Sequence, residues 1–121
     1  MTPATKPGQR YYYEWIAPPI QSGEKAYIFL VVDEYSQFVF DLGIEDHITD
    51  IMISNKVMDL IYHPDFKNNG SFELIIGGSE YAHNEINKII KPEGGTLIHD
   101  EAKLDHFLMP ILKQMFSKWQ Q

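Results

Sequence analysis

The chain has 121 residues with a formal net charge of −7, and 44% of them are hydrophobic, which is typical of one globular domain with a substantial core. The absence of cysteine excludes disulfides, thiolate chemistry and cysteine zinc sites. The sequence contains neither an apolar run of about 18 residues, which would predict a membrane span, nor a secretory pattern after Met1, which would predict a signal peptide. We therefore expect a cytoplasmic protein, and the 10 Lys and Arg against 17 Asp and Glu make a general nucleic-acid binder unfavourable.

The N-terminal third of the chain predicts a tail followed by three successive antiparallel strands. Residues 1–10 hold two prolines and a glycine, which indicates a flexible tail. A short aromatic strand is predicted over 11–16, and a second strand over 26–32, where every residue is apolar or aromatic. The third strand, 38–42, follows a polar loop at 33–37, so the second and third strands are expected to form a hairpin.

The three strands differ in how polar residues are spaced along them. The second strand has no polar alternation, which predicts that both of its faces are covered. The third strand alternates between apolar and polar residues, which indicates one wetter face. The aromatic first strand is expected to be half core and half edge, with its rings available to form a partner surface or to stack on bases. Helices are therefore expected to pack on the sheet and cover its apolar faces.

After Gly43 the hydrophobic period changes from two to about 3.6, which predicts a helix. Asp46 or Thr49 is its expected cap, and His63-Pro64 is its expected end. The residues expected to share its apolar face are Ile48, Ile51, Met52, Met58 and Ile61.

The second half of the chain predicts a strand over 72–76, a helix over 81–90 capped by Ser79, and a strand over 96–99. A long final helix follows, in which Pro110 is expected to cause a kink or to mark a shortened first turn. An unbroken apolar stripe at helical spacing indicates this helix. The stripe consists of Leu104, Phe107, Leu108, Ile111, Leu112, Met115, Phe116 and Trp119.

The predicted order of elements is β-β-β-α-β-α-β-α within a single domain over 11–121. Short connections and right-handed crossovers leave few ways to arrange it, and we expect an α/β fold with a five-stranded mixed sheet and helices on both faces. This order resembles the ribonuclease H-like fold.

Two stretches strengthen the resemblance. The hairpin reads YIFLVVDEYSQFVF, and it resembles the second and third strands of the integrase and transposase catalytic core. Residues Phe72–Ile86 read FELIIGGSEYAHNEI and resemble the segment in which Asp-Asn-Gly-Ser-Glu-Phe closes the fourth strand of that family. The resemblance covers roughly Glu14 to Ser117. A bacterial domain of the same architecture without an assigned activity is the alternative relative.

The family resemblance implies a metal-dependent active site, and this sequence departs from it. The family holds two divalent metals, Mg²⁺ or Mn²⁺, between carboxylates on neighbouring strands and a late helix. The alignment matches Glu14 to the first-strand acid, puts the second acid on Ile76, and puts the late-helix acid near Ile111 on the apolar stripe. The resemblance therefore implies a catalytic core that has lost its acids.

Other acids provide weaker candidates for chemistry. Asp33 and Glu34 stand together after the second strand, although adjacent acids in a turn point in different directions and are usually solvated. Asp100, Glu101 and Asp105 lie at the start of the final helix, together with His99 and His106 as the densest group of potential ligands. Glu101 and Asp105 are four residues apart and can share a helix face, whereas an acid at a helix N-terminus is also favoured by the helix dipole.

Three smaller signals favour structural roles. His47, His63 and His83 are isolated along the sequence and are expected at the surface or in caps. Gly77-Gly78-Ser79 before a helix resembles a phosphate-binding loop, but it lacks the lysine and the further glycines of the known motifs. Free backbone amides at the N-terminus of that helix could bind an anion, but the negative charge of Glu80 opposes anion binding.

The sequence leads to three functional hypotheses. The first is a catalytically degenerate ribonuclease H-like domain without a cofactor that binds a protein partner through an aromatic or acidic surface. The alternative is a metal-dependent nuclease or nucleotidyl-transfer enzyme with a displaced acidic site that uses Mg²⁺ or Mn²⁺ at Glu14, Asp33 or the group from Asp100 to Asp105. The third is nucleic-acid binding inherited from the fold, which the acidic charge disfavours. The oligomeric state is not predicted.

Overall fold

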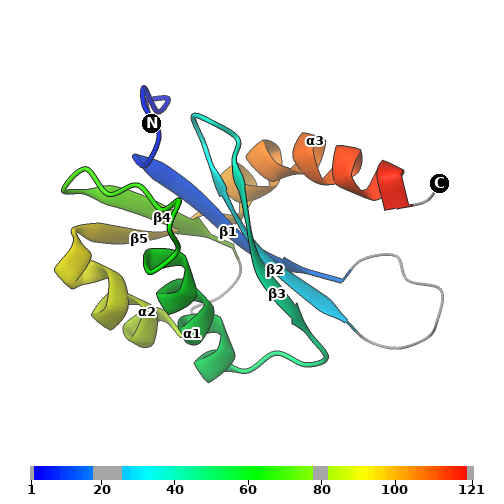
Figure 1. The fold of residues 1–121 in the computed structure, drawn as a ribbon, viewed down its shortest axis with the longest axis horizontal. Helices are drawn as coiled ribbons and strands as arrows, with labels where there is room; N and C mark the ends of the chain where they lie inside the picture. Colours follow the sequence, from blue (N-terminus) through cyan, green and yellow to red (C-terminus); the bar gives the residue numbers. More distant parts are fainter. Residues whose placement is uncertain (1, 18–25, 78–81, 120–121) are drawn as a thin grey trace.

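The computed structural model describes residues 2–17, 26–77 and 82–119. Its elements are β1 (Arg10–Ile16), β2 (Tyr27–Asp33), β3 (Val39–Glu45), α1 (Asp50–Ile61), β4 (Phe72–Ile76), α2 (His83–Ile90), the short 3₁₀ helix η1 (Lys91–Glu93), β5 (Gly95–His99) and α3 (Glu101–Trp119) (Figure 1). The predicted order of strands and long helices is confirmed. The expected cap Ser79, the anion-binding loop around Gly78, and the acid Glu80 lie outside the described residues.

The five strands form one mixed sheet in the order β3-β2-β1-β4-β5. β2 pairs antiparallel with β1 and with β3, whereas β4 pairs parallel with β1 and with β5. This order places β1 at the centre of the sheet, so its neighbours cover both of its edges. The prediction that the aromatic strand is half edge was wrong, since Tyr11, Tyr12 and Tyr13 are each at most 1% exposed.

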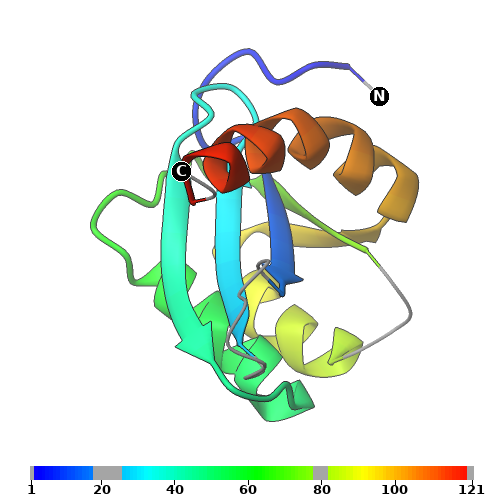
Figure 2. The ribbon, with the colours of Figure 1, turned by 90° about the vertical axis from the view of Figure 1, so that its right-hand side faces the viewer.

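Helices cover both faces of the sheet, as predicted: α1 and α2 lie on one face, and α3 lies on the other (Figure 2). Because side chains alternate along a strand, Tyr11 and Tyr13 pack into the α1/α2 layer, and Tyr12 packs into the α3 layer. The ring of Tyr12 stacks on the ring of Phe107 of α3 with a distance of 4.2 Å between the ring centroids. β1 therefore connects the two halves of the core.

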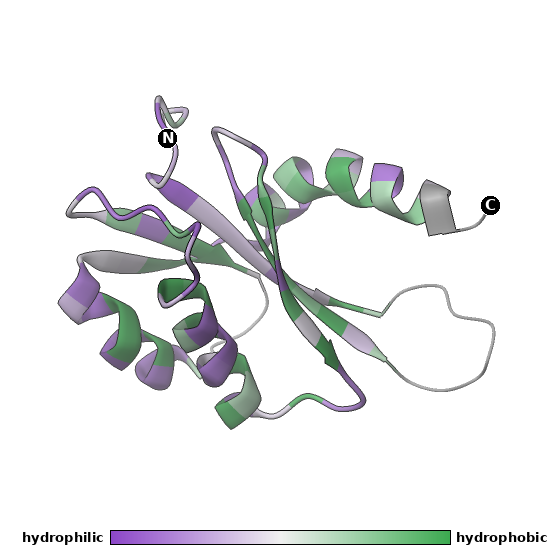
Figure 3. Cartoon of the chain, in the orientation of Figure 1, coloured by the Kyte–Doolittle hydropathy of each residue, from purple (hydrophilic) through white to green (hydrophobic). Residues whose placement is uncertain are grey.

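The burial patterns of β2 and β3 match the prediction for the two strands of the hairpin. All but the first residue of β2 are buried, so both faces of this strand are covered. On β3 only Phe40 and Leu42 are buried, and the intervening Asp41 is exposed. Figure 3 shows the hydrophobic residues of the hairpin at the centre of the molecule, with both hydrophobic and hydrophilic residues on each helix. No helix within the described part of the chain has the length and apolarity needed to cross a membrane.

α1 begins as predicted, because the Thr49 side chain caps it by accepting a hydrogen bond from the Met52 backbone N–H. The predicted buried face is confirmed for Ile48, Met52 and Ile61, which pack against the core, and was wrong for Ile51 and Met58. Ile51 and Met58 are 72% and 43% exposed, whereas the side chains that face the sheet are Ile53, Ser54, Val57 and Leu60. Apolar residues occur at helical spacing on both sides of this helix, so periodicity alone could not decide which side is buried.

The segment before β1 is tied to the end of the hairpin. β1 begins at Arg10, the last residue of the expected tail, and residues 2–9 carry no helix or strand. The Gly8 backbone N–H donates to Asp33 Oδ1 at 2.9 Å, and the Ala4 N–H donates to Glu34 Oε2 at 2.6 Å. These bonds bring the N-terminal segment against the loop between β2 and β3.

Candidate functional site

Glu34 belongs to a partly buried ionic cluster at one end of the sheet. Arg10 at the start of β1 donates to Glu34 at 2.9 Å and to Glu73 of β4 at 2.7 Å. The Tyr12 hydroxyl donates to Glu34 Oε1 at 2.5 Å. Burial acts to raise the pKa of Glu34, but the hydrogen bonds from Tyr12, Ala4 and Arg10 and the charge of Arg10 outweigh it and lower that pKa. The carboxylate is therefore held ionised and fully engaged.

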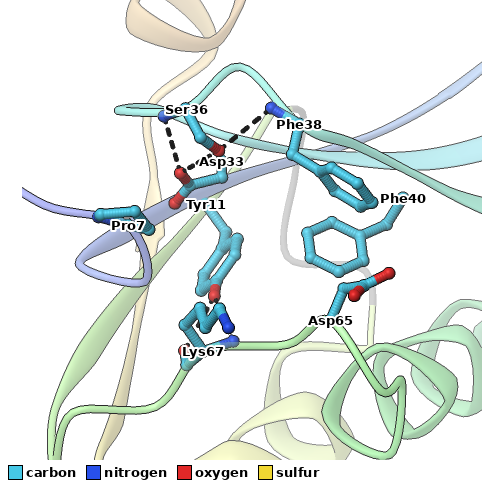
Figure 4. Close-up of a pocket in the computed structure, with 8 residues that line it drawn as sticks. All are labelled: Pro7, Tyr11, Asp33, Ser36, Phe38, Phe40, Asp65 and Lys67. Atoms are coloured by element: carbon cyan, nitrogen blue, oxygen red, sulfur yellow. Dashed lines mark hydrogen bonds between the residues drawn. The ribbon is translucent and has the colours of Figure 1, made fainter.

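Asp33 is placed on the opposite face of the sheet from Glu14 and is 3% exposed. Its carboxylate accepts hydrogen bonds from the Gly8 N–H, from the Ser36 N–H at 2.8 Å and from the Ser36 hydroxyl at 2.6 Å (Figure 4). These bonds order the loop between β2 and β3. Asp33 thus ties three stretches of chain together.

A cavity of about 210 Å³ opens beside Asp33. Aromatic rings form much of its wall, with Phe38 and Phe40 edge to face at a centroid distance of 4.8 Å (Figure 4). The cavity brings together Asp33 and Asp65, but Lys67 also lines it and opposes a cationic ligand. Its lining is Pro7, Tyr11, Asp33, Ser36, Phe38, Phe40, Asp65 and Lys67.

Glu14 lies on β1 at the sheet face that α3 covers, two residues after Tyr12. Burial raises the pKa of Glu14 to about 7, a hydrogen bond from the Trp15 N–H opposes the rise, and the charges of Asp105 and Glu101 add to it. Glu14 therefore holds its proton to a much higher pH than an ordinary glutamate does. We call Glu14, Glu101 and Asp105 the acidic corner.

Asp100 has a different role from its neighbours. Its side chain accepts a hydrogen bond from the Lys103 N–H at 3.0 Å, and its backbone carbonyl accepts one from the Leu104 N–H. Its own backbone N–H donates to the Ile76 carbonyl. Asp100 therefore caps α3 and anchors it to the end of β4, as an acid at this position is expected to do.

Gly77 follows β4 beside Glu14 and adds no carboxylate to the acidic corner. The parallel register pairs Tyr13 with Ile76, so the next pair along the strands is Glu14 and Gly77. A Cβ atom at Gly77 would lie 2.8 Å from Leu104 Cδ2 and 3.4 Å from Glu101 Cγ. Leu104 is 1% exposed, so its side chain cannot move away into solvent. α3 therefore packs directly against the backbone of Gly77.

Two positions that the family alignment gave lie away from the acidic corner. Ile76 is 0% exposed and packs in the α1/α2 layer, so it faces away from the acidic corner. The acid that adjoins Gly77 comes from the first turn of α3, at Glu101, and not from the region of Ile111. Ile111 lies ten residues further along, about 15 Å away along the helix axis, and packs against the core.

The acidic corner does not fit the metal centre that the family resemblance implied. Within residues 2–17, 26–77 and 82–119, no three His, Asp or Glu side chains are placed to hold a metal ion together. Glu101 and Asp105 are exposed, and Glu14 is partly neutral near pH 7, whereas Mg²⁺ and Mn²⁺ require ionised oxygen ligands that converge.

Sequence reasoning missed a histidine pair between α2 and β5. His83 Nδ1 lies 2.6 Å from His99 Nε2, and the Asn87 side chain lies 2.9 Å from His83 Nε2. One ring nitrogen must donate its proton to the other at this distance. Two nitrogens that share a zinc ion lie about 3.3 Å apart, so the pair is a hydrogen bond and not a preformed metal site. No sequence signal links two histidines 16 residues apart.

The outer side of α1 carries a row of exposed and mainly apolar side chains, two of which, Ile51 and Met58, had been predicted to be buried. Ile51, Met58 and Tyr62 are 72%, 43% and 78% exposed, and Asn55 lies between them at helical spacing. We call these four residues the α1 stripe. Scattered single apolar residues on a surface are ordinary, but an aligned row of them marks a candidate interaction face.

Comparisons with known proteins relate the fold, and only the fold, to retroviral integrases. No protein-family model and no curated protein matches the chain. The chain is similar to a chain of the simian T-cell lymphotropic virus intasome, solved in complex with PP2A regulatory subunit B56 gamma, with 13% identity, a TM-score of 0.65, and coverage of 95% of this chain and 43% of that one.

A second similar structure is the HTLV-2 integrase catalytic core domain in complex with magnesium, with 12% identity, a TM-score of 0.63, and coverage of 93% of this chain and 72% of that one. The chain spans less than half of the simian viral chain. The expected ribonuclease H-like fold is thus confirmed.

Proposed function

We propose that this chain uses its ribonuclease H-like fold as a catalytically degenerate protein-binding domain. The proposal has two parts. The chemistry that this fold can support is absent because the three acids of the acidic corner are not placed to hold a metal ion together. The domain instead acts through an exposed surface.

The observation that carries the proposal is the contact between α3 and Gly77. Two-metal phosphoryl transfer needs carboxylates that surround the ions at bonding distance. A Cβ atom at position 77 would come within 2.8 Å of Leu104 Cδ2, so a carboxylate there requires the tip of Leu104 to shift. Gly77 therefore adds no acid beside Glu14, and the acids that are present do not surround an ion, since Glu101 and Asp105 are exposed.

Two further observations support a binding role. The α1 stripe exposes large apolar side chains where a folded monomer gains nothing from them. One structural neighbour was solved in complex with a protein regulatory subunit, which supports the use of this fold in protein assemblies. The net charge of −7 favours a partner with basic residues over a nucleic acid.

A metal-dependent nuclease or nucleotidyl-transfer enzyme is the alternative function. It is favoured by the gathering of Glu14, Glu101 and Asp105, whose mutual repulsion contributes to the raised pKa of Glu14. In this alternative the acidic corner takes Mg²⁺ or Mn²⁺. Asp33 has no part in it, because it lies on the other face of the sheet.

A cleavage assay separates the two functions. End-labelled duplex DNA and an RNA–DNA hybrid are incubated with the protein and millimolar Mg²⁺ or Mn²⁺ at pH 7 and pH 8.5, the higher pH ensuring that Glu14 is ionised. We expect both substrates to remain intact. Cleavage that is lost in both Glu14→Gln and Glu101→Gln, but retained in the exposed control Asp41→Asn, would establish the alternative.

A further inference from the structure

We infer that the α1 stripe is the docking site for a basic amphipathic helix of a partner protein. This inference rests on the proposed binding function and specifies the chemistry of its partner. It is drawn from the shape of the stripe and from the charges around it.

The stripe has the geometry of a helix-binding ridge. Its members follow the spacing i, i+4, i+7 and i+11, so they form one row along the helix. From Ile51 to Tyr62 the row extends about 16 Å at 1.5 Å per residue. Apolar side chains in such a row pack into the groove between side chains of a second helix, whereas an extended strand would need a free sheet edge.

A groove beside the stripe gives the partner a place to insert side chains. This groove has a volume of about 340 Å³ and lies between α1 and the end of β3. Its lining includes Ile51 and Asn55 of the stripe together with Asp59 and Glu45. Thr49, Met52 and Lys56 also line the groove, and Lys56 pairs with Glu45, which leaves Asp59 as its acid without an ion pair among the described residues.

The charges that border the stripe are negative. Helical spacing places Asp59 along one border and Asp50 along the other, and neither makes an ion pair with another described residue. The only cation of α1 is Lys56, which is 12% exposed at its side chain, pairs with Glu45 at 3.3 Å and lies over the Phe29 ring. Its charge is turned inward and does not balance the two aspartates.

This charge pattern selects among possible occupants. A second copy of the chain would present the same two aspartates, and its α1 would bring no cation besides Lys56, which is paired with Glu45. An acidic helix would be repelled by these aspartates. A helix with an apolar face flanked by Lys and Arg would instead satisfy both the stripe and its borders, since complementary charge sets specificity and speeds association.

Fluorescence anisotropy with a defined probe tests the inference. The probe is a labelled 18-residue helical peptide with leucines on one face and lysines on the other. A peptide of the same composition in scrambled order controls for charge alone, and a version with glutamate in place of lysine controls for the leucine face. We expect the ordered lysine peptide to bind at least about tenfold more tightly than either control, and more weakly as salt rises.

Matched variants locate the binding surface. Ile51→Ser/Tyr62→Ser removes apolar groups that are 72% and 78% exposed, and we expect it to weaken binding about tenfold or more. Ile44→Ser/Met109→Ser removes groups that are 64% and 50% exposed elsewhere, and should bind within twofold of wild type. Asp50→Asn/Asp59→Asn should weaken binding several-fold and reduce its salt dependence, and Asp41→Asn/Asp65→Asn should change neither.

Three results would overturn the inference. They are equal binding of the ordered and scrambled lysine peptides, undiminished binding by Ile51→Ser/Tyr62→Ser, and a wild-type dimer in analytical ultracentrifugation that this variant converts to a monomer. The last result would mean that a second copy covers the stripe. Failure of the peptide to bind leaves the cleavage assay unaffected, whereas metal-dependent cleavage would reject the proposed function whatever the peptide does.

Discussion

Replacing Arg10 with alanine is expected to lower the free energy of unfolding by about 3 kcal/mol, because it leaves Glu34 buried without its cation. The Arg10 side chain is 8% exposed and that of Glu34 is 14% exposed, so solvent cannot replace the lost contact. The variant also loses the hydrogen bond from Arg10 to the Thr2 carbonyl. Thermal or urea unfolding monitored by circular dichroism measures the change, with a fall in Tm on the order of 10 °C.

The loss of unfolding free energy in Arg10→Ala should be larger at neutral pH than at acidic pH. The pKa of Glu34 is lowered in the folded protein, so this carboxylate contributes stability that is present above its ordinary pKa. That stability is lost as the pH falls through the folded pKa. The difference between wild type and variant should therefore be largest near pH 7 and should shrink below about pH 4.5.

Lys88→Ala is the matched control for Arg10→Ala. Lys88 and Glu85 form an ion pair of 3.6 Å on the surface, where both side chains are more than half exposed. Its removal should change the unfolding free energy by less than about 0.5 kcal/mol. A comparable loss in both variants, or an Arg10→Ala penalty that does not change with pH, would contradict the assignment of a partly buried ionic cluster.

Gly77→Asp is expected to cost about 2 to 3 kcal/mol, because its side chain must displace the tip of the buried Leu104 and crowd Glu101. The new carboxylate would also stand beside Glu14 and Glu101, which adds repulsion between like charges. Gly77→Ala separates the two causes, since it introduces the contact without the charge. We expect Gly77→Ala to lower the free energy of unfolding by about half as much as Gly77→Asp does, as measured by urea unfolding.

A double-mutant cycle tests whether Leu104 is the obstacle. If Leu104 closes the space, the cost of Gly77→Ala should fall by about 1 kcal/mol in the Leu104→Ala background, because the added methyl group then enters the cavity that the leucine leaves. Additive effects within about 0.5 kcal/mol would show that position 77 accepts a side chain without moving α3. The proposed packing of α3 against Gly77 would then be wrong.

The order of elements was predictable because each element carries a strong local signal. The unbroken apolar row of β2 and the alternation of β3 determine which faces need cover, and the glycines and prolines separate the elements. The long stripe of α3 predicted its packing in the same way, and Leu104 and Leu108 are indeed buried. Local pattern and global fold agree in these regions.

The candidate site was predictable only in part, because it depends on register and contact between distant segments. Sequence alignment assigned the missing acid to Ile76, whereas the sheet register and the approach of α3 show that Gly77 is the residue beside Glu14. A shift of one residue along a strand moves a side chain to the opposite face. The raised pKa of Glu14 likewise comes from burial and from acids about 90 residues away, which no local pattern encodes.

The burial of Ile51 and Met58 on α1 was mispredicted for a similar reason. This helix has apolar residues on two sides, and the sheet covers the side of Ile53, Val57 and Leu60. The remaining row, from Ile51 to Tyr62, is left for solvent or for a partner. A second apolar face that the fold does not use is itself informative, since it separates residues needed for folding from residues available for binding.

Calorimetric titration of Mn²⁺ into the wild-type protein at pH 8 tests the central claim most directly. At this pH Glu14 is mostly ionised, so protonation cannot mask a metal site. We predict no saturable binding up to millimolar metal, and no difference between wild type and Glu14→Gln. A stoichiometric binding isotherm that Glu14→Gln and Glu101→Gln each abolish would contradict the account and would make this domain a metal-dependent member of its fold.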